Sequence, residues 1–392
     1  MRECDDKMHR KVYVEVDRER IGMNVSNVIK KYDHYDYYLG VVKGNAYGHG
    51  YEIIPTLIQN GINYLAVSSL DEAIHARRID ESIPILIMEP VDIADVPLCQ
   101  EQRLTITVSS YDYWQKLAKL SIDEIKIHLK INTGLNRLGI GEKVELKEVY
   151  EEMAVKSGIF IEGIYTHLAT TGLVDAMYDR QVERFLALTS VIDVQAIPIV
   201  HVGRSATLEV KEKLPFANGV RVGALLYGIN QTFRSYHGVK GYLRKMRDGW
   251  RKRKLNLSKS TLSSGLEVGT GLSLKAPVIE INRVYQGETV GYGGLFKAKR
   301  DTYIATLPVG YKDGLYLEFC KSKVWINGQL YPVVGVVNMC LITVEVDEKV
   351  SVGSECVVLG GEVCIKGVAA LISSTPYVVM TGLSCGISRV YK

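Results

Sequence analysis

The stretch YLGVVKGNAYGHG, residues 38–50, joins an apolar run to a lysine and a glycine-rich segment. Residues 38–42 are short and apolar enough for a buried strand, which we expect to end on Lys43. A lone lysine at a strand end usually extends to water. Here three glycines follow that let the main chain approach a ligand, and Tyr47 adds a hydroxyl and His49 an imidazole. The stretch therefore predicts a partly buried, nucleophilic amine that can condense with a carbonyl.

The composition is that of a globular protein. A length of 392 residues predicts a large barrel plus a second domain, or two mid-sized domains. A hydrophobic content of 47% and a charged content of 23% exclude a disordered chain. The formal net charge of +4 is mild, so we expect neither nucleic acid nor a membrane as a partner.

Cysteine usage and the amino terminus indicate the compartment. The seven cysteines are odd in number and include no CxxC pair, which predicts free thiols in a reducing compartment and no metal site. The first residues, MRECDDKMHRK, are charged, and no later run is apolar over the length that spans a bilayer. We therefore expect a cytoplasmic protein.

Apolar runs alternate with helical spacing through the first half of the chain. Seven candidate strands follow the one before Lys43, at residues 62–67, 83–88, 104–108, 125–131, 160–165, 197–202 and 219–227. Residues 70–78, 144–155 and 178–192 carry the spacing of amphipathic helices. Eight alternating strands and helices predict a (β/α)8 barrel, and a doubly wound open sheet fits the periodicity nearly as well.

The sequence divides into three predicted segments. Residues 1–229 form the barrel, with a helix at 18–31 and an alternating strand at 11–17 that is free to pack with the β domain instead. Residues 230–273 are polar and basic, which predicts a linker or surface insertion rather than a binding patch. Residues 274–392 form a β-strand domain.

Short strands with turns characterise the third segment. The candidate strands lie at residues 276–284, 303–309, 324–327, 330–337, 341–346 and 356–359. The dipeptides Asn327-Gly328 and Gly360-Gly361 sit where hairpins are expected to reverse.

The lysine stretch resembles the pyridoxal-phosphate lysine motif of the alanine racemase family. Further blocks resemble the family in the same order, namely HLKINTGLNRLG at 128–139, YTHLATTG at 165–172, HVGRSAT at 201–207, GVRVGALLYG at 219–228, ETVGYGGLF at 288–296, LPVGYKDG at 307–314, VVGVVNMC at 333–340 and STPYVV at 374–379. The resemblance covers nearly the whole chain. It implies pyridoxal 5'-phosphate as cofactor, interconversion of L-alanine and D-alanine for peptidoglycan, and a homodimer with shared active sites.

The resemblance also implies residues that bind the cofactor. They are Lys43, Tyr47, His167, His201, Ser205, Arg221, Gly223, Ala224 and Tyr377, with the hydroxyl of Ser205, the amides of Gly223 and Ala224, and Tyr377 on the phosphate. Arg221 is implied to lie against the pyridine nitrogen. Because an arginine keeps its proton, that nitrogen stays unprotonated and the ring is a weaker electron sink, which favours reprotonation over side reactions.

Two bases are implied by the reaction, because racemisation removes a proton from one face of the α-carbon and returns one to the other. The resemblance gives Lys43 one face and Tyr292 the opposite face. A phenol is a weak base unless cations or hydrogen bonds assist it. We expect a chain of His167, Arg221 and His201 to do so.

The implied substrate-binding residues are Arg137, Tyr311 and Met339. The planar fork of Arg137 suits the α-carboxylate of an amino acid, and Lys130, carbamylated in some family members, would hold that fork in place. Tyr311 is implied at the pocket entrance and the amide of Met339 toward the carboxylate. The resemblance also implies a homodimer in which Tyr292, Tyr311 and Met339 face Lys43 of the other subunit.

The chain departs from the family at several positions. It has Cys340 and Asn132 where the family usually has aspartate, Arg204 where asparagine is usual, and a longer basic stretch before Lys275. Cys340 neighbours Met339, so substrate choice is the property most affected.

Three alternatives stand beside alanine racemisation. A racemase for serine or a broader range of amino acids is opposed by the rings of Tyr311 and Tyr377, which leave room for a small side chain. A decarboxylase of basic amino acids needs anionic groups that the sequence does not obviously supply. A non-catalytic pyridoxal-phosphate-binding protein predicts loss of the second base, whereas Tyr292 is present.

Overall fold

A computed structural model of the chain describes residues 10–171, 175–230, 242–243, 246–247, 249–250 and 265–392. Most of the basic stretch predicted at 230–273 lies outside these residues. The chain divides into two compact units. The sheet unit comprises residues 1–21, 44–53 and 269–392, and the barrel unit comprises residues 22–43 and 54–268.

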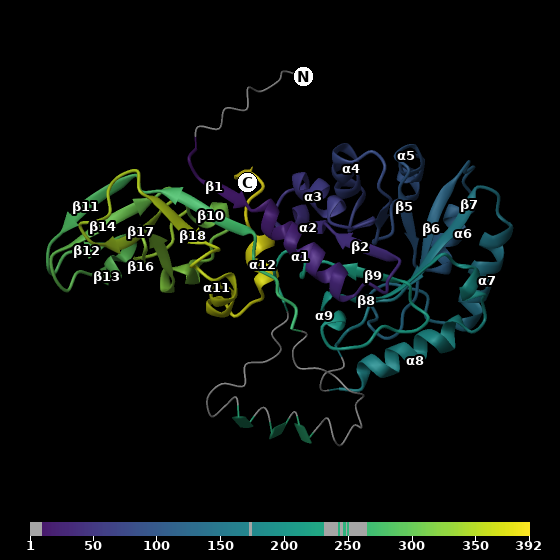
Figure 1. The fold of residues 1–392 in the computed structure, drawn as a ribbon. Helices are drawn as coiled ribbons and strands as arrows, with labels where there is room; N and C mark the ends of the chain where they lie inside the picture. The colour runs from purple at the N-terminus through teal and green to yellow at the C-terminus, as the bar shows by residue number, and fades with distance from the viewer. Residues whose placement is uncertain (1–9, 172–174, 231–241, 244–245, 248, 251–264) are drawn as a thin grey trace. The chain divides into compact units, whose positions relative to one another are not determined.

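The barrel unit contains a closed parallel barrel, which confirms the predicted (β/α)8 architecture over the open sheet. Its strands, most of them labelled in Figure 1, are β2 (Tyr37–Val41), β3 (Tyr64–Val67), β4 (Ile85–Ile87), β5 (Thr105–Val108), β6 (Ile125–Lys130), β7 (Ile159–Tyr165), β8 (Ile199–Arg204) and β9 (Gly219–Val222). The ring closes where β2 pairs with β9 in the register Gly40↔Val222. Strands β3, β4, β5 and β9 are buried along their whole length, as is usual when helices cover a parallel sheet.

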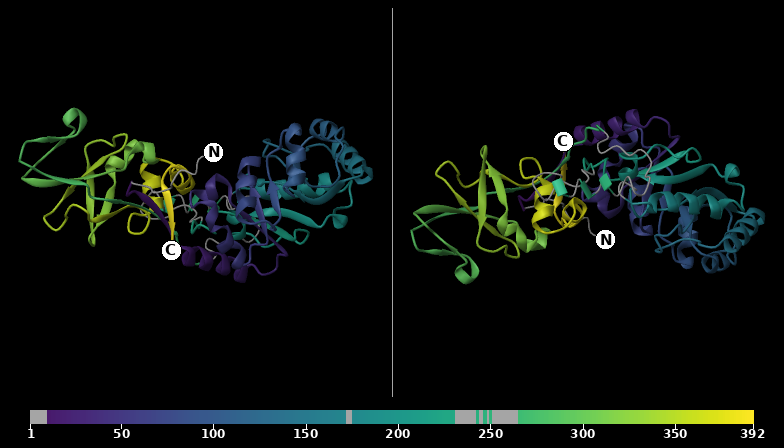
Figure 2. Two further views of the ribbon diagram at one scale, coloured as in Figure 1. Left: turned by 90° about the horizontal axis from the view of Figure 1, so that it is seen from above. Right: turned by 90° about the horizontal axis from the view of Figure 1, so that it is seen from below.

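Helices surround the barrel strands, as the views in Figure 2 show. They are α3 (Ile54–Gln59), α4 (Leu70–Ile79), α5 (Val96–Glu101), α6 (Tyr111–Leu117), α7 (Lys143–Val155), α8 (Met177–Thr189) and α9 (Ser205–Leu208), with 3-10 turns η2 (Ile93–Asp95) and η3 (Val194–Ala196). Helix α1 (Arg18–Lys31) and the turn α2 (Lys43–Tyr47) each contribute residues to both units. The three predicted amphipathic helices correspond to α4, α7 and α8.

The barrel interior contains several polar side chains. Because successive strand residues point to opposite faces, alternate residues of each strand face inward. Buried polar side chains on β5 to β9 include Thr105, Thr107, His128, Lys130, Glu162, His201 and Arg221. Buried polar groups require partners, so this interior is a place to look for chemistry.

The sheet unit is built on a nine-stranded sheet of order β11-β14-β17-β16-β15-β18-β10-β1-β19, with a separate β12–β13 hairpin. The strands are β1 (Tyr13–Val16), β10 (Leu272–Pro277), β11 (Glu280–Val284), β12 (Thr289–Val290), β13 (Phe296–Lys297), β14 (Thr302–Leu307), β15 (Lys323–Ile326), β16 (Gln329–Val334), β17 (Ile342–Val346), β18 (Glu355–Leu359) and β19 (Ser388–Tyr391). The remaining elements are α11 (Ile365–Leu371), α12 (Pro376–Thr381), η1 (Tyr51–Ile53), η4 (Tyr292–Gly294), η5 (Tyr311–Asp313) and η6 (Leu317–Lys321). This β-rich unit confirms the second half of the fold prediction.

Two details of this unit differ from prediction. The strand expected at 276–284 is two strands, because Pro277 ends β10 and has no N–H to continue the ladder. Asn327-Gly328 forms the expected hairpin turn, with φ of 47° and 88°. Gly360-Gly361 does not join two strands of the sheet. Its turn closes an isolated bridge to Val363 and leads into α11.

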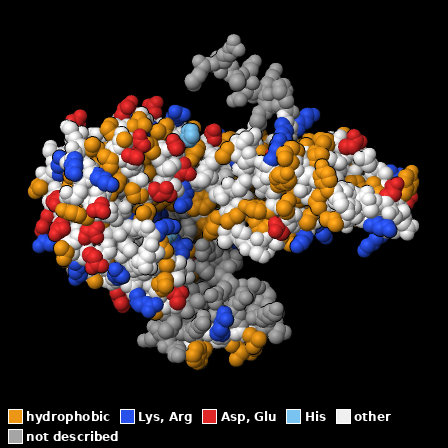
Figure 3. All heavy atoms as spheres, turned by 180° about the vertical axis from the view of Figure 1, so that it is seen from behind, with side chains coloured by type: hydrophobic (Ala, Val, Ile, Leu, Met, Phe, Trp, Pro, Cys, Tyr) orange, Lys and Arg blue, Asp and Glu red, His pale blue; other side chains and the backbone are white. Residues whose placement is uncertain are grey.

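The surface carries charges of both signs. On the face drawn in Figure 3, Lys and Arg side chains and Asp and Glu side chains are both spread over the described atoms. This mixture agrees with the mild net charge of +4. Among the residues that the structure describes, no helix is both long and apolar enough to cross a membrane. The six described cysteines are all free thiols.

Candidate functional site

Lys43 begins a left-handed turn rather than ending a strand. Strand β2 stops at Val41, so the prediction that it ends on Lys43 is wrong by two residues. The next residues have positive φ: Gly44 (64°), Asn45 (53°), Ala46 (50°) and Tyr47 (54°). Left-handed geometry costs roughly 1–2 kcal/mol for each residue that carries a Cβ. Strain of this kind persists where the surrounding structure enforces it, often at functional sites.

The turn brings one pair of predicted residues together within the sheet unit. The ring of Tyr47 meets that of Tyr377, on α12, edge to face, with centroids 6.0 Å apart. Both were predicted to bind the cofactor.

The segments that directly follow β8 and β9 bring together the predicted phosphate-binding groups. Ser205 opens α9 directly after β8, and Gly223 and Ala224 follow directly after β9. The amide of Gly223 donates to Ser205 Oγ at 2.9 Å. A hydroxyl that accepts one hydrogen bond can still donate its own hydrogen to an anion.

Arg221 is buried in the barrel and held by four hydrogen bonds. Its Nη1 donates to His201 Nδ1 at 2.7 Å and to the His201 carbonyl at 2.8 Å. Its Nη2 donates to the carbonyls of Thr166 at 2.7 Å and Val202 at 3.2 Å. Burial lowers the pKa of Arg221 to about 10, so the guanidinium stays protonated at neutral pH. His201 lies on β8, within the strand predicted at residues 197–202.

The hydrogen bonds continue from His201 to residues for which the sequence suggested no role. Burial and the charge of Arg221 lower the pKa of His201 well below its ordinary value, so the ring is neutral. Since Arg221 donates to Nδ1, the ring hydrogen is on Nε2, which lies 2.9 Å from His128 Nδ1. His128 in turn donates from Nε2 to Glu162 at 3.3 Å. The result is a one-directional relay, Arg221 to His201 to His128 to Glu162.

Glu162 closes this relay as an anion. Burial opposes ionisation, but hydrogen bonds from His128, Lys126 and Tyr64 lower the pKa of Glu162 to about 2. Gly163 gives the His128 ring its space, because a Cβ there would lie 2.5 Å from the ring. The alternation of His128 with Lys130 on β6 was the one sequence signal that the ring faces inward.

His167 is separate from this relay. Among the described residues, no hydrogen bond joins its side chain to Arg221 or His201, so the predicted three-residue chain is replaced by the relay through His128. Burial, Arg221 and Lys130 lower the pKa of His167 to about 2, which keeps the ring neutral.

Lys130 is the last residue of β6, and its amine has no hydrogen-bond partner in the part of the chain that the structure describes. It is only 5% exposed, and its Nζ lies 4.3 Å from the centre of the Tyr165 ring. Burial, with the charges of Arg221 and Arg137, lowers the pKa of Lys130 well below its ordinary value. Burial therefore favours the neutral, nucleophilic form of the amine.

Arg137 lies in the loop after β6, with its side chain exposed. The loop is closed by the bond from the Asn132 amide to the Ile140 carbonyl at 2.8 Å. Asn132 Oδ1 also accepts from the amides of Gly134 and Asn136. An amide oxygen thus caps the turn where the family usually has a carboxylate.

The predicted second base and the predicted substrate-binding residues Tyr311 and Met339 lie in the sheet unit. Tyr292 sits in the turn between β12 and β13 and is 77% exposed. Tyr311 is 45% exposed and Met339 is 56% exposed. The loops of these last two residues are joined, because the Tyr311 amide donates to the Asn338 carbonyl at 3.0 Å and the Lys312 amide to the Met339 carbonyl at 3.0 Å.

An arginine near the amino terminus secures the Tyr311 turn. Arg10 donates to both carboxylate oxygens of Asp313 and to the Pro308 carbonyl at 2.6 Å. Asp313 is buried and accepts from the Gly310 amide at 2.9 Å. The sequence offered no signal for this pair, since the two residues lie 303 positions apart in the chain.

Comparison with known proteins identifies the family. The alanine racemase N-terminal domain model matches residues 16–231, and the alanine racemase C-terminal domain model matches residues 271–391. The chain belongs to the alanine racemase family. An alanine racemase of Streptococcus gordonii is 29% identical over 98% of this chain and 99% of its own length.

Solved structures agree with the family fold. An alanine racemase from E. faecalis superposes with a TM-score of 0.85 at 28% identity, covering 98% of this chain and 99% of the other. A histidine racemase from Leuconostoc mesenteroides superposes with a TM-score of 0.83, covering 98% of each chain, but at 23% identity it shows the fold alone.

Alanine racemases depend on pyridoxal phosphate, and the strand ends of the barrel unit fit this cofactor. The cofactor requires an amine, an anion-binding group and a partner for its ring nitrogen. Lys43 follows β2, and Arg221 and Gly223 belong to the adjacent strand β9 and its end, with Ser205 bonded to Gly223. The donor set is therefore suitable at one end of the barrel, where such folds hold their active sites.

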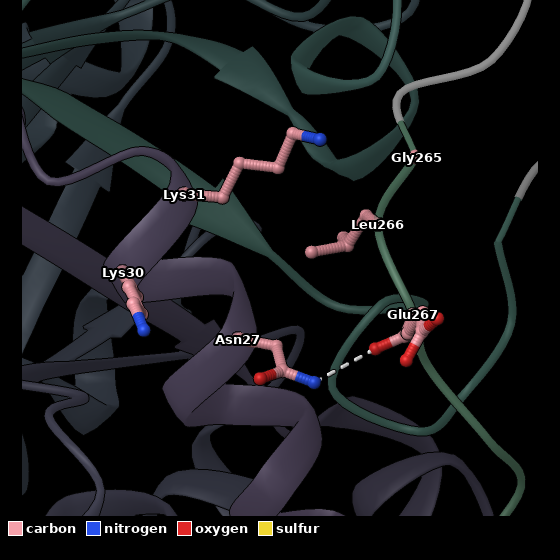
Figure 4. Close-up of a pocket in the computed structure, with 6 residues that line it drawn as sticks. All are labelled: Asn27, Lys30, Lys31, Gly265, Leu266 and Glu267. Atoms are coloured by element: carbon pink, nitrogen blue, oxygen red, sulfur yellow. Dashed lines mark hydrogen bonds between the residues drawn. The ribbon is translucent and has the colours of Figure 1, made fainter.

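One surface recess lies away from these residues. It has a volume of about 400 Å³ and is lined by Asn27, Lys30, Lys31, Gly265, Leu266 and Glu267. Figure 4 shows the Leu266 side chain extending toward α1 and the Asn27 amide donating to the Glu267 carbonyl, at 3.0 Å. None of the predicted site residues lines this recess, so it is separate from the candidate site.

Proposed function

We propose that this protein interconverts L-alanine and D-alanine with pyridoxal 5'-phosphate as cofactor and with Lys43 and Tyr292 as the two bases. The observation that carries the proposal is the buried Arg221, because its hydrogen bond with His201 and the relay to Glu162 keep a protonated guanidinium at the strand ends. When bound, pyridoxal phosphate withdraws electrons from the α-carbon of the attached amino acid.

The barrel residues hold and tune this cofactor in the proposed mechanism. Ser205 and the amides of Gly223 and Ala224 would bind the phosphate, with the Gly223 amide exchanging its hydrogen bond to Ser205 Oγ for one to the phosphate, and Lys43 would bind the aldehyde carbon. Arg221 donates to the ring nitrogen and, by keeping its proton, limits electron withdrawal. This limit favours simple return of a proton to the α-carbon. Tyr47 and Tyr377 are proposed to join the cofactor set, supported by their mutual contact.

Proton transfer is proposed on opposite faces. The Lys43 amine removes or returns the α-proton on one face, and the Tyr292 phenol does so on the other. Arg137 orients the substrate through its carboxylate, with Tyr311 and the amide of Met339 completing the substrate pocket.

A second copy of the chain is proposed to complete the site. The residues proposed to face the substrate from the sheet unit, Tyr292, Tyr311 and Met339, are all exposed in the single chain, as are Leu295 and Leu317 near them in sequence. Exposed apolar side chains in such number are typical of an interaction surface. Because a base works best where water is excluded, we propose a homodimer in which this surface covers the lysine end of the partner.

Two further assignments belong to this proposal. D-alanine produced here would supply peptidoglycan, as in the resembling family. The free thiols of the described cysteines suit a reducing compartment, which supports a cytoplasmic location.

The test is conversion of single L-amino acids. The purified protein with pyridoxal phosphate is incubated with alanine, serine, histidine and larger residues in turn, and the D forms are separated by chiral chromatography. We expect alanine to give the highest kcat/KM. A faster conversion of serine would favour the alternative raised by Cys340, and no D-amino acid from any substrate would favour a non-catalytic binding protein.

Lys130 provides a separate prediction. A buried amine whose pKa is lowered by burial and by two arginines is suited to react with carbon dioxide, and the resulting carbamate would give Arg137 an anionic partner. Lys130→Ala should then raise the KM for alanine roughly tenfold, with partial recovery when acetate is added. Lys147→Ala, an exposed lysine on α7, serves as the control. Unchanged kinetics in Lys130→Ala would reduce Lys130 to an ordinary strand-end residue.

A further inference from the structure

We propose that Arg389 and Tyr391, on the last strand β19, are positioning residues that hold the left-handed turn after Lys43. The inference rests on the proposed function, in which Lys43 binds the cofactor and acts as a base. Both residues belong to the carboxyl-terminal SRVYK, which lies outside the predicted site residues.

The turn needs support from outside itself. Asn45, Ala46 and Tyr47 carry Cβ atoms in left-handed geometry, which L-residues adopt reluctantly. The turn has internal hydrogen bonds, from the Gly48 amide to the Gly44 carbonyl and from the Gly50 amide to the Asn45 carbonyl, each 2.9 Å. An ordinary right-handed turn offers equivalent bonds without the steric cost, so contacts from elsewhere must select this conformation.

Arg389 supplies the first contact. Its Nε donates to the Gly48 carbonyl at 3.1 Å, at the end of the left-handed run. The rest of the guanidinium donates to the turn before β19, with Nη1 bonded to the carbonyls of Ser384 at 2.7 Å and Ile387 at 2.6 Å, and Nη2 to that of Leu383 at 3.3 Å. The planar guanidinium of Arg389 thus hydrogen-bonds both the turn after Lys43 and the segment that precedes β19.

Tyr391 supplies the second contact. Its hydroxyl lies 2.9 Å from the His49 carbonyl and 2.7 Å from Glu52 Oε2, so its one hydrogen is shared between two acceptors of the same loop. The fit is close on both sides of His49. A Cβ on Gly50 would lie 2.0 Å from the Tyr391 hydroxyl, and a Cβ on Gly48 would lie 2.2 Å from the Met380 carbonyl.

Strand β19 is itself well anchored, so it can act as a support. It pairs with β1 in parallel from Tyr13↔Ser388 to Val16↔Tyr391. The guanidinium carbon of Arg18 lies 4.8 Å from the centre of the Tyr391 ring, and the Arg18 amide donates to the Lys392 carbonyl at 2.8 Å. The loop is thereby attached to a strand of the nine-stranded sheet, and the main chain from which Lys43 projects is fixed through its neighbours.

The test measures amide exchange in the loop. The amides of Gly48, His49 and Gly50 are hydrogen-bonded within the turn, so opening of the turn exposes them. In full-length Arg389→Lys without added cofactor, hydrogen–deuterium exchange of residues 44–53 should be about tenfold faster, because one ammonium cannot replace the fork. Tyr391→Phe, which keeps the ring, should accelerate it about threefold.

A matched control separates this role from general stability. Tyr13→Phe removes a similar bond, from a tyrosine hydroxyl to Glu355 at 2.6 Å, on the neighbouring strand β1. We expect it to leave exchange in residues 44–53 unchanged. In Arg389→Lys and Tyr391→Phe, covalent uptake of pyridoxal phosphate should also slow, with little change in the KM for alanine.

The proposal is overturned if both variants are folded and exchange in residues 44–53 stays at the wild-type rate, or if Tyr13→Phe accelerates it equally. If Arg389→Lys fails to fold, Tyr391→Phe alone decides. The exchange readout requires no turnover, so absence of racemisation by the wild-type protein would refute the proposed function without deciding this inference.

Discussion

Replacement of Lys43 by alanine is expected to abolish both racemisation and the visible absorbance of lysine-bound pyridoxal phosphate. The variant loses the nucleophile that holds the cofactor and one of the two bases, so kcat/KM for alanine should fall by a factor on the order of a thousand or more. Both changes are measured on one sample, by absorbance spectroscopy and by chiral chromatography.

The control is a lysine at the start of another element. Lys143 begins α7, as Lys43 begins α2, and its amine bonds to Ser190 on the surface at 3.3 Å. Lys143→Ala should retain wild-type absorbance and activity. Full activity in Lys43→Ala would refute the assignment on which the whole site depends.

Replacement of Tyr292 by phenylalanine is expected to have the second largest effect, and the effect should depend on the enantiomer. The variant keeps the ring and deletes the hydroxyl, so racemisation should fall by a factor on the order of a hundred or more. Exchange of the α-proton with deuterated solvent should survive for the enantiomer that Lys43 serves, which the family resemblance gives as D-alanine. Exchange from L-alanine should nearly vanish.

Tyr285→Phe is the matched control, because Tyr285 is another exposed tyrosine close to the β12–β13 hairpin. It should exchange both enantiomers at the wild-type rate. If Tyr292→Phe exchanges the α-proton of both enantiomers almost normally, a mechanism in which Lys43 alone serves both faces of the α-carbon explains the reaction better. If it loses exchange of both equally while the cofactor remains bound, Tyr292 has no face-specific role.

The strands and helices of the barrel were predictable because their signal is local. Each strand is a short apolar run and each predicted helix has an amphipathic face, so the eight-strand pattern could be read within short windows of sequence. The position of Arg221 in the eighth strand followed from the same pattern. The turn at Asn327-Gly328 was also predictable, since both residues tolerate positive φ.

The remaining features depend on contacts between distant parts of the chain. The pairing of β1 with β19 joins the two ends of the sequence, and no local pattern specifies it. The relay from His201 through His128 to Glu162 joins three strands, and it becomes visible only when the barrel closes. The left-handed turn was hidden because Asn45, Ala46 and Tyr47 do not require positive φ by themselves. Their conformation is imposed by packing.

The central claim, racemisation of alanine by two bases on opposite faces, is tested most directly by the isotope at the α-carbon of the first product. Wild-type protein is incubated with L-alanine in deuterated water. D-alanine from the earliest stage of conversion is isolated, and its deuterium content is measured by mass spectrometry. We predict deuterium at the α-carbon from the start, because the base that returns the proton is not the base that removed it. D-alanine that keeps a substantial share of its original proton, or no D-alanine at all, would contradict the account.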